Sequence, residues 1–238
     1  MESDVGQIPV SHKALAWFEA NMKQTLMAVG GILVVGLIIA LFVYRQNEAE
    51  ITASEALSNV SMPQASASGI RPDLVEGYLK VAANYPKSTA GARALLLAAG
   101  GLFVDGKYEE AKTQFERFKR EYSDSLFMGE ALLGIAASLD AQGKTRDAMA
   151  AYKDLIDHRP GDSNVPQAKF ALGRLHEAQN EPEQARSLFE DVERSVPYGS
   201  LGDEARMQLE ELKTKFPKLL APVMPMPTNA SPLKAEKR

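Results

Sequence analysis

The sequence predicts an all-α protein in which a single transmembrane helix precedes an α-solenoid, a stack of antiparallel helix pairs. A run of 19 residues near the N-terminus carries no charge, and this is the length that a bilayer-spanning helix needs. Downstream of this run, small and apolar residues recur with a fixed period of 37 residues, which is typical of a helical-repeat protein. The chain of 238 residues contains no cysteine, which excludes disulfides and Cys-ligated metals.

The uncharged run comprises residues 26–44 and would form a helix about 28 Å long, close to the hydrocarbon thickness of a bilayer. Lys23 precedes the run and Arg45 follows it. A cleaved signal peptide has a shorter apolar core, of about 7–15 residues, followed by a small-residue cleavage site. Here the polar sequence RQNE follows directly. We therefore interpret residues 26–44 as a retained transmembrane helix.

The basic residues beside the span predict its orientation. Lys13, Lys23 and the amino terminus lie on its N-terminal side, whereas only Arg45 follows it before Arg71. Basic residues are retained on the cytoplasmic side of a membrane. Residues 1–25 are therefore predicted to be a short cytoplasmic segment, with the rest of the chain across the membrane.

The remaining domain boundaries follow from composition. Residues 45–70 are predicted to form a helical extension and a linker, because the run SMPQASASG at its end is small and polar. Residues 71–216 contain the repeats. Residues 217–238 include five prolines and few large apolar side chains, which predicts a disordered tail.

Each repeat unit is predicted to be two helices joined by a short turn. The turn residues Gly106, Gly143 and Asn180 are of the types that adopt left-handed backbone angles after a helix. Residues 74–85 fit a second helix that precedes the full units, and residues 200–216 fit a capping first helix that follows them. Residues at the same position of successive units form a column. The columns that define the period are Ala94, Ala131, Ala168 and Ala205; Ala111, Ala148 and Ala185; and the aromatic residues Phe115, Tyr152 and Phe189.

Two further sets of residues specify how each unit is built. Small residues in the first helix are expected to face the small residues of the second helix, because a larger side chain would force the helices apart. Serines before the first helices are predicted to cap them. The small residues are Ala99, Ala136 and Gly173, which face Ala111, Ala148 and Ala185, and the capping serines are Ser88, Ser125, Ser163 and Ser200.

This pattern resembles the tetratricopeptide repeat, with a period of 37 instead of 34 residues. The residues that carry it are Ala99, Gly106, Tyr108, Ala111 and Phe115 in the first unit, Ala136, Gly143, Ala148 and Tyr152 in the second, and Gly173, Ala185 and Phe189 in the third. Together with the span and the segment Trp17–Asn21, the chain is similar to the membrane-anchored tetratricopeptide family that includes the ancillary subunit of the Sec translocon.

The resemblance implies a scaffold at the bacterial inner membrane with its repeats in the periplasm. Its implied partners are translocon components, periplasmic chaperones and exported client proteins. Two alternatives stay open: an envelope scaffold for cell division or outer-membrane assembly, and a structural homo-oligomer.

The resemblance also implies a protein-binding groove lined by the first helices. Its apolar members would anchor a partner segment, although Leu96 and Leu133 could instead pack inside the solenoid, and two arginines could bind a carboxylate or a carbonyl. The candidate residues are Arg93, Leu96, Gly100, Phe103, Glu130, Leu133, Ala137, Gln167, Phe170, Arg174, Glu204 and Met207.

No catalytic pattern is found, so we expect a protein that is not an enzyme and has no metal, cofactor or small-molecule substrate. His176-Glu177 begins like a zinc-protease motif, but the second histidine is replaced by Asn180. His176 is therefore expected to be a partly buried structural residue, and His158 to interact with the last carbonyls of a helix. The net charge of -4 argues against a nucleic-acid partner.

Overall fold

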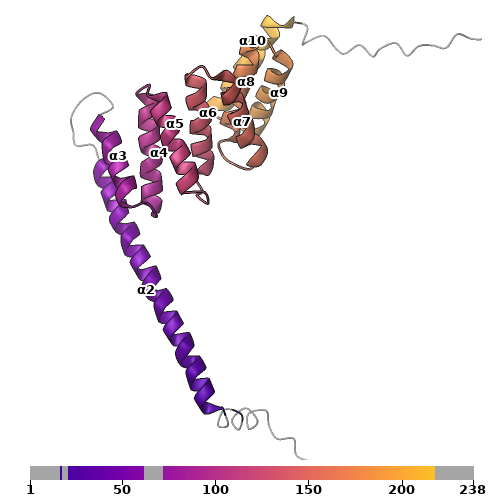
Figure 1. The fold of residues 1–238 in the computed structure, drawn as a ribbon. Coiled ribbons are helices and arrows are strands. Elements are labelled where there is room, and N and C mark those ends of the chain that lie inside the picture. The colour runs from indigo at the N-terminus through magenta and orange to yellow at the C-terminus, as the bar shows by residue number, and fades with distance from the viewer. Residues whose placement is uncertain (1–16, 18–20, 62–71, 218–238) are drawn as a thin grey trace, which may run out of the picture.

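A computed structural model describes residues 17, 21–61 and 72–217, and its regular elements are helices throughout (Figure 1). A long helix forms a rod, and shorter helices stack away from one end of it. The predicted tail beyond residue 217, most of the cytoplasmic segment and the linker residues 62–70 lie outside the described residues. The helices are α2 (Met22–Ser61), α3 (Pro72–Asn84), α4 (Thr89–Val104), α5 (Tyr108–Glu121), α6 (Met128–Ala141), α7 (Thr145–His158), α8 (Val165–Ala178), α9 (Pro182–Ser195) and α10 (Ser200–Lys215).

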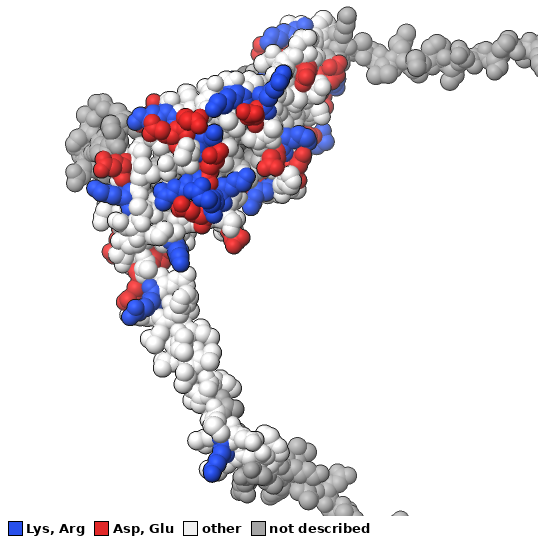
Figure 2. Space-filling model, in the orientation of Figure 1, with Lys and Arg blue, Asp and Glu red and all other residues white. Residues whose placement is uncertain are grey.

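The long helix α2 contains the whole predicted span. In the part of the chain that the structure describes, it is the one helix long and apolar enough to cross a membrane, as judged by length and composition. None of its most apolar window is buried. Figure 2 shows the rod below the stack without Lys, Arg, Asp or Glu over most of its length. Exposed apolar surface of this extent marks a region that contacts a membrane or another protein.

The last turns of α2 belong to the helical stack. Ala53 is fully buried, and Leu57 and Val60 pack against the first core cluster. Gly77 of α3 lies so close to α2 that a Cβ at this position would be 2.8 Å from Val60 Cγ1. The predicted helical extension thus pairs with α3 as the first helix of the incomplete unit.

The three full units are the pairs α4–α5, α6–α7 and α8–α9, and α10 packs on α9. The turns within the pairs confirm the prediction of left-handed backbone angles. Gly106, Gly143 and Asn180 have φ angles of 76°, 71° and 60°. The second helices bury one apolar stripe each, which for α5 is Ala111, Phe115 and Phe118. The predicted solenoid is therefore confirmed.

The small residues predicted at the helix crossings are buried, although Gly173 lies against the Phe189 ring and not against Ala185. Ala99, Ala136 and Gly173 are buried in the first helices, as are the alanines of the second helices. Because these side chains are small, the paired helices approach closely and exclude water along their length.

The predicted serine caps are right only for the first full unit. Ser88 precedes α4, and its Oγ accepts a hydrogen bond from the amide of Gly91 at 2.8 Å. Helices α6 and α8 begin two residues later in the repeat, so Ser125 and Ser163 lie in the turns before them. Ser200 is already the first residue of α10. Before α8 the Asp162 carboxylate accepts a bond from the amide of Asn164 at 2.9 Å instead.

Candidate protein-binding face

The predicted groove residues lie on the first helices α4, α6, α8 and α10, which follow one another along the stack. We call the solvent-exposed side of these four helices the first-helix face. Five of the candidates have exposed side chains there: Arg93, Glu130, Gln167, Arg174 and Glu204. Gly100, Phe103 and Ala137 are half-buried at its border.

One candidate column is turned away from this face and toward the neighbouring helices. Leu96 is only 5% exposed and belongs to the core, and Leu133 is half-buried. The Phe170 ring lies 5.5 Å from the Phe189 ring of its own unit. Met207 occupies the same column on α10 and is 62% exposed, because no described helix follows α10. Leu96 lies three residues after Arg93, and three residues rotate a side chain by about 300° around the helix axis. The Leu96 column therefore points about 60° away from the Arg93 column.

Two apolar residues on the first-helix face were not predicted. Leu97 is 43% exposed and Val104 is 65% exposed. With Arg93 and Gly100 they form a stripe at spacings of four, three and four residues, which is one face of a helix. This spacing is visible in the sequence, whereas the predicted groove contains Leu96 and Phe103, each one residue earlier.

The two arginines of the face are free to bind an acidic or carbonyl group. Arg93 and Arg174 are exposed, and neither forms an ion pair with any residue that the structure describes. Asp140 of α6 is near enough to Arg174 to interact with it electrostatically. Burial raises the pKa of the Asp140 carboxyl above its ordinary value, and the Arg174 charge partly offsets this effect. Burial also raises the pKa of Tyr152 beneath them, and the Asp140 charge adds to the increase.

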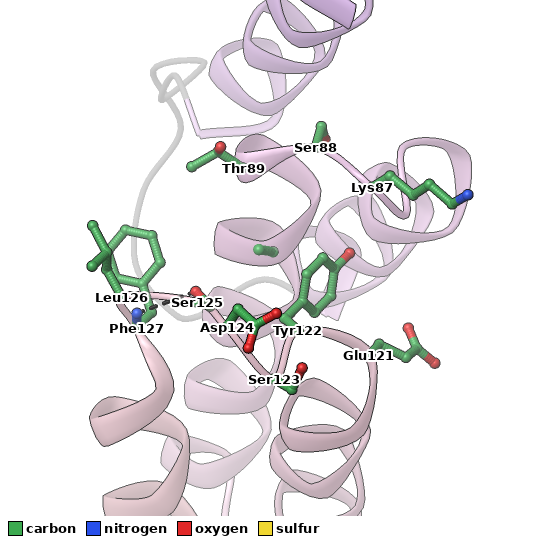
Figure 3. A pocket seen from close by; sticks show the side chains of 11 residues that line it. Lys87, Ser88, Thr89, Glu121, Tyr122, Ser123, Asp124, Ser125, Leu126 and Phe127 are labelled. Atoms are coloured by element: carbon green, nitrogen blue, oxygen red, sulfur yellow. Dashed lines mark hydrogen bonds between the residues drawn. The ribbon is translucent and has the colours of Figure 1, made fainter. Parts of the chain in front are cut away.

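A second surface lies at the turns between the units. A hollow of about 420 Å³ opens between the α3–α4 turn and the α5–α6 turn, as Figure 3 shows. Leu126 stands beside it and is 96% exposed, and the amide of Phe127 donates to Ser125 Oγ at 3.2 Å. The Tyr122 hydroxyl is buried there without a hydrogen-bond partner among the described residues. The repeat pattern did not predict this hollow, since its turn residues differ from unit to unit.

The histidines have structural partners. His176 is partly buried, and its Nδ1 lies 2.6 Å from Glu181 Oε2. His158 Nδ1 lies 3.0 Å from the carbonyl oxygen of Asp154 at the end of α7. Both observations confirm the roles predicted for these residues. In the described ranges no group of three His, Cys, Asp or Glu residues could hold a metal ion.

Paired helices with small residues at their crossings, left-handed turns and an exposed first-helix face define a helical-repeat scaffold for protein–protein interaction. A family model described as tetratricopeptide repeat-like domain matches residues 15–213 of this chain. The chain therefore belongs to the tetratricopeptide repeat-like family. The matched range includes the predicted span as well as the repeats.

Several solved structures are similar to this chain at low sequence identity. A tetratricopeptide repeat protein from Parabacteroides merdae is 13% identical, with a TM-score of 0.50 over 73% of this chain and 62% of that chain. PcrH from Pseudomonas aeruginosa is 18% identical, with a TM-score of 0.47 over 53% and 94% of the two chains. The Yersinia enterocolitica type III secretion chaperone SycD, in complex with a peptide of the translocator YopD, is 20% identical, with a TM-score of 0.46 over 52% and 92%. A search of the curated proteins found no match.

Proposed function

We propose that this protein is a membrane-anchored tetratricopeptide scaffold that holds other proteins at the bacterial inner membrane, ancillary to protein export. Its partners would be translocon components, periplasmic chaperones and exported clients. One observation carries the proposal: a single helix, α2, contains the apolar run at its start and the core residue Ala53 near its end. A partner bound to the repeats is thereby held at a fixed distance from the membrane.

The chemistry of the first-helix face supports binding of an extended protein segment. Leu97 and Val104 offer exposed apolar contacts at one end of the face. Arg174, without an ion pair in the described structure, offers a bidentate donor for a carboxylate or a backbone carbonyl further along. An exported chain that has not yet folded presents both kinds of group.

The orientation in this proposal places the repeats in the periplasm. Lys23 precedes the apolar run and Arg45 follows it, and the further basic residue Lys13 lies before the span. Protease added to spheroplasts should therefore digest the repeats before the membrane is broken. Repeats that stay protected until lysis would reverse the orientation.

Site-specific photocrosslinking in intact membranes tests the partner class. A photoreactive amino acid at Leu97 should capture translocon subunits or exported chains, whereas the same group at Thr113, which is exposed on the second helix α5, should not. Arg174→Glu should lower the capture several-fold. Arg146→Glu on α7 is the matched control, since it reverses an exposed charge away from the first-helix face.

The captured proteins distinguish this proposal from its two alternatives. Division or outer-membrane assembly proteins in place of translocon subunits would favour an envelope scaffold of another kind. Crosslinks to a second copy of this chain alone would favour a structural homo-oligomer. Capture that is equal from both positions and insensitive to Arg174→Glu would exclude the first-helix face.

A further inference from the structure

The α3–α4 turn lies against α2 at the point where the predicted span ends. A hollow of about 490 Å³ separates the two. Apolar groups form most of its wall, and its two cationic residues come from segments that are far apart in the sequence. The lining residues are Phe42, Arg45, Gln46, Ala49 and Glu50 of α2, together with Asn84, Tyr85, Pro86, Lys87 and Ser88 of the turn.

The turn is held in this position by the Glu50 carboxylate. Its Oε2 accepts a hydrogen bond from the amide of Thr89 at 2.8 Å, and its Oε1 accepts one from the amide of Ala90 at 3.0 Å. These two amides belong to the first turn of α4, where the helix dipole also favours a negative charge. Glu50 therefore fixes the position of the α3–α4 turn along the axis of α2.

The negative charge at the wall of the hollow is compensated, whereas the positive charges are not. The carboxylate of Glu50 is occupied by the two amides. Arg45 and Lys87 form no hydrogen bond or ion pair with any residue that the structure describes. Figure 2 shows basic side chains at the junction between the rod and the stack. The hollow thus presents two uncompensated cations beside an apolar wall.

If residues 26–44 span the bilayer, the hollow lies at the level of the phospholipid headgroups. Arg45 is the first charge after the apolar run and lies about 4.5 Å along the helix axis from Phe42. The polar zone on each side of a bilayer is about 5–8 Å thick. Phe42, which is 69% exposed, would then contact the upper ends of the acyl chains.

We propose that this hollow binds the headgroup of an anionic phospholipid, a proposal that depends on the membrane anchoring proposed above. The phosphate would lie between Arg45 and Lys87, and the glycerol and the upper acyl chains would lie along Phe42 and Tyr85. A lipid fits better than a protein helix, because the hollow begins at Phe42, beside the end of the predicted span, where headgroups would lie. Its two free cations match a single phosphate diester better than an apolar helix.

Spin-labelled lipids provide the test. The full-length chain is reconstituted in phosphatidylcholine nanodiscs that contain a trace of spin-labelled phosphatidylglycerol or spin-labelled phosphatidylcholine. The immobilised fraction gives the preference of the protein for the anionic lipid. Arg45→Gln and Lys87→Gln should each lower this preference about fivefold. Lys107→Gln, at the opposite edge of the stack, is the matched control and should leave the preference unchanged.

Glu50→Ala separates a built site from general attraction between charges. Removal of an acidic group should raise the preference for phosphatidylglycerol if only net charge matters. The proposal predicts a lower preference, because Lys87 is no longer held beside Arg45. Far-UV circular dichroism of each variant verifies that the helices are intact.

The outcomes separate the two proposals. A wild-type chain that does not float with phosphatidylcholine vesicles would refute the membrane anchor itself. A chain that floats but shows no preference for the anionic lipid, or keeps it in the Arg45 and Lys87 variants, would overturn the headgroup site alone. Crosslinking of the hollow to a membrane helix of another protein, without lipid preference, would likewise overturn it.

Discussion

Gly173 of α8 lies directly against the ring of Phe189 of α9, so that a Cβ at Gly173 would be 2.7 Å from Phe189 Cε1. The Phe189 side chain is fully buried and lies against Phe170, which restricts its movement. Gly173→Val should therefore lower the free energy of unfolding by about 1–3 kcal/mol through overpacking. Urea denaturation followed by circular dichroism measures the change.

The control for this substitution is Gly100→Ala, in the same kind of helix. A Cβ at Gly100 would have no atom within 4 Å. Alanine is favoured over glycine in a helix by up to about 1 kcal/mol, so this variant should be as stable as the wild type or more stable. If both variants destabilise the protein equally, the close crossing of α8 and α9 is not the cause.

Two substitutions of Asn180, in the turn of the third unit, are predicted to have different effects on stability. Asn180 has a φ angle of 60°, in the left-handed region, where the equivalent residues Gly106 and Gly143 are glycines. Asn180→Ala should cost about 1 kcal/mol of unfolding free energy, because alanine keeps the β-carbon that disfavours this region and loses the short polar side chain with which asparagine tolerates it. Asn180→Gly should be neutral or stabilising. Thermal unfolding of the two variants gives the sign, and an Ala variant as stable as the Gly variant would contradict the assignment.

The repeat period predicted these turns and crossings because they depend on contacts within one unit. Gly106 and Gly143 recur since each unit needs the same backbone angle, and Ala99 and Ala111 recur since each helix pair crosses in the same way. Because each unit has the same requirement, the same residue types recur along the chain, and the pattern can be recognised from one sequence.

Features that join different units or depend on helix rotation were not predictable in this way. The Glu50 carboxylate binds amides 39 and 40 residues further along the chain, on another helix, and no spacing rule connects them. The choice between Leu96 and Leu97 depends on a rotation of 100° about one helix axis. The serine caps of α6 and α8 were wrong because their turns are two residues longer than the turn before α4.

The contact between Glu50 and α4 has a consequence for stability as well as for lipid binding. Glu50→Ala leaves the amides of Thr89 and Ala90 without this acceptor and should cost about 1–2 kcal/mol of unfolding free energy. Glu55→Ala, at an exposed position of the same helix, is the control and should change the stability by less than about 0.5 kcal/mol. Equal losses in the two variants would show that the amides of α4 do not depend on Glu50.

Asp140 makes stability depend on pH in a defined direction. Burial raises the pKa of this carboxyl, so the folded protein keeps its proton to a higher pH than the unfolded chain does. The contribution of Asp140 to the free energy of unfolding therefore falls as the pH rises from the ordinary pKa of an aspartate through the raised folded pKa. Asp140→Asn should accordingly stabilise the protein at neutral pH, and the gain should vanish at acidic pH.

The role of Arg174 in this titration can be measured separately. Its charge opposes the effect of burial, so Arg174→Ala should raise the pKa of Asp140 further. Carboxyl-carbon NMR of the Asp140 side chain across an acid titration reports the pKa directly. Arg146→Ala, on the neighbouring helix, should leave the pKa of Asp140 where it is. An unchanged pKa in Arg174→Ala would contradict the electrostatic contact between the two residues.

Because the end of α2 packs against the stack, the stability of the repeats is predicted to depend on α2 as well as on residues 71–216. The end of α2 buries Ala53 completely and Leu57 and Val60 in part, and the Tyr78 hydroxyl donates to Ser61 Oγ at 3.3 Å. A fragment that begins at residue 46 keeps these contacts, whereas one that begins at residue 72 exposes the apolar side of α3. Burial of one Val or Leu side chain supplies about 1.5–3 kcal/mol, so the shorter fragment should lose at least this much unfolding free energy.

Urea denaturation of the two soluble fragments measures this difference. The loss should be accompanied by faster proteolysis of α3, because this helix loses one of its two packing partners. Leu57→Ala in the longer fragment should reproduce part of the loss, whereas Asn59→Ala, exposed on the same turn, should not. Two fragments of equal stability would mean that α2 ends before the stack begins, and the rigid connection between membrane and repeats would then be absent.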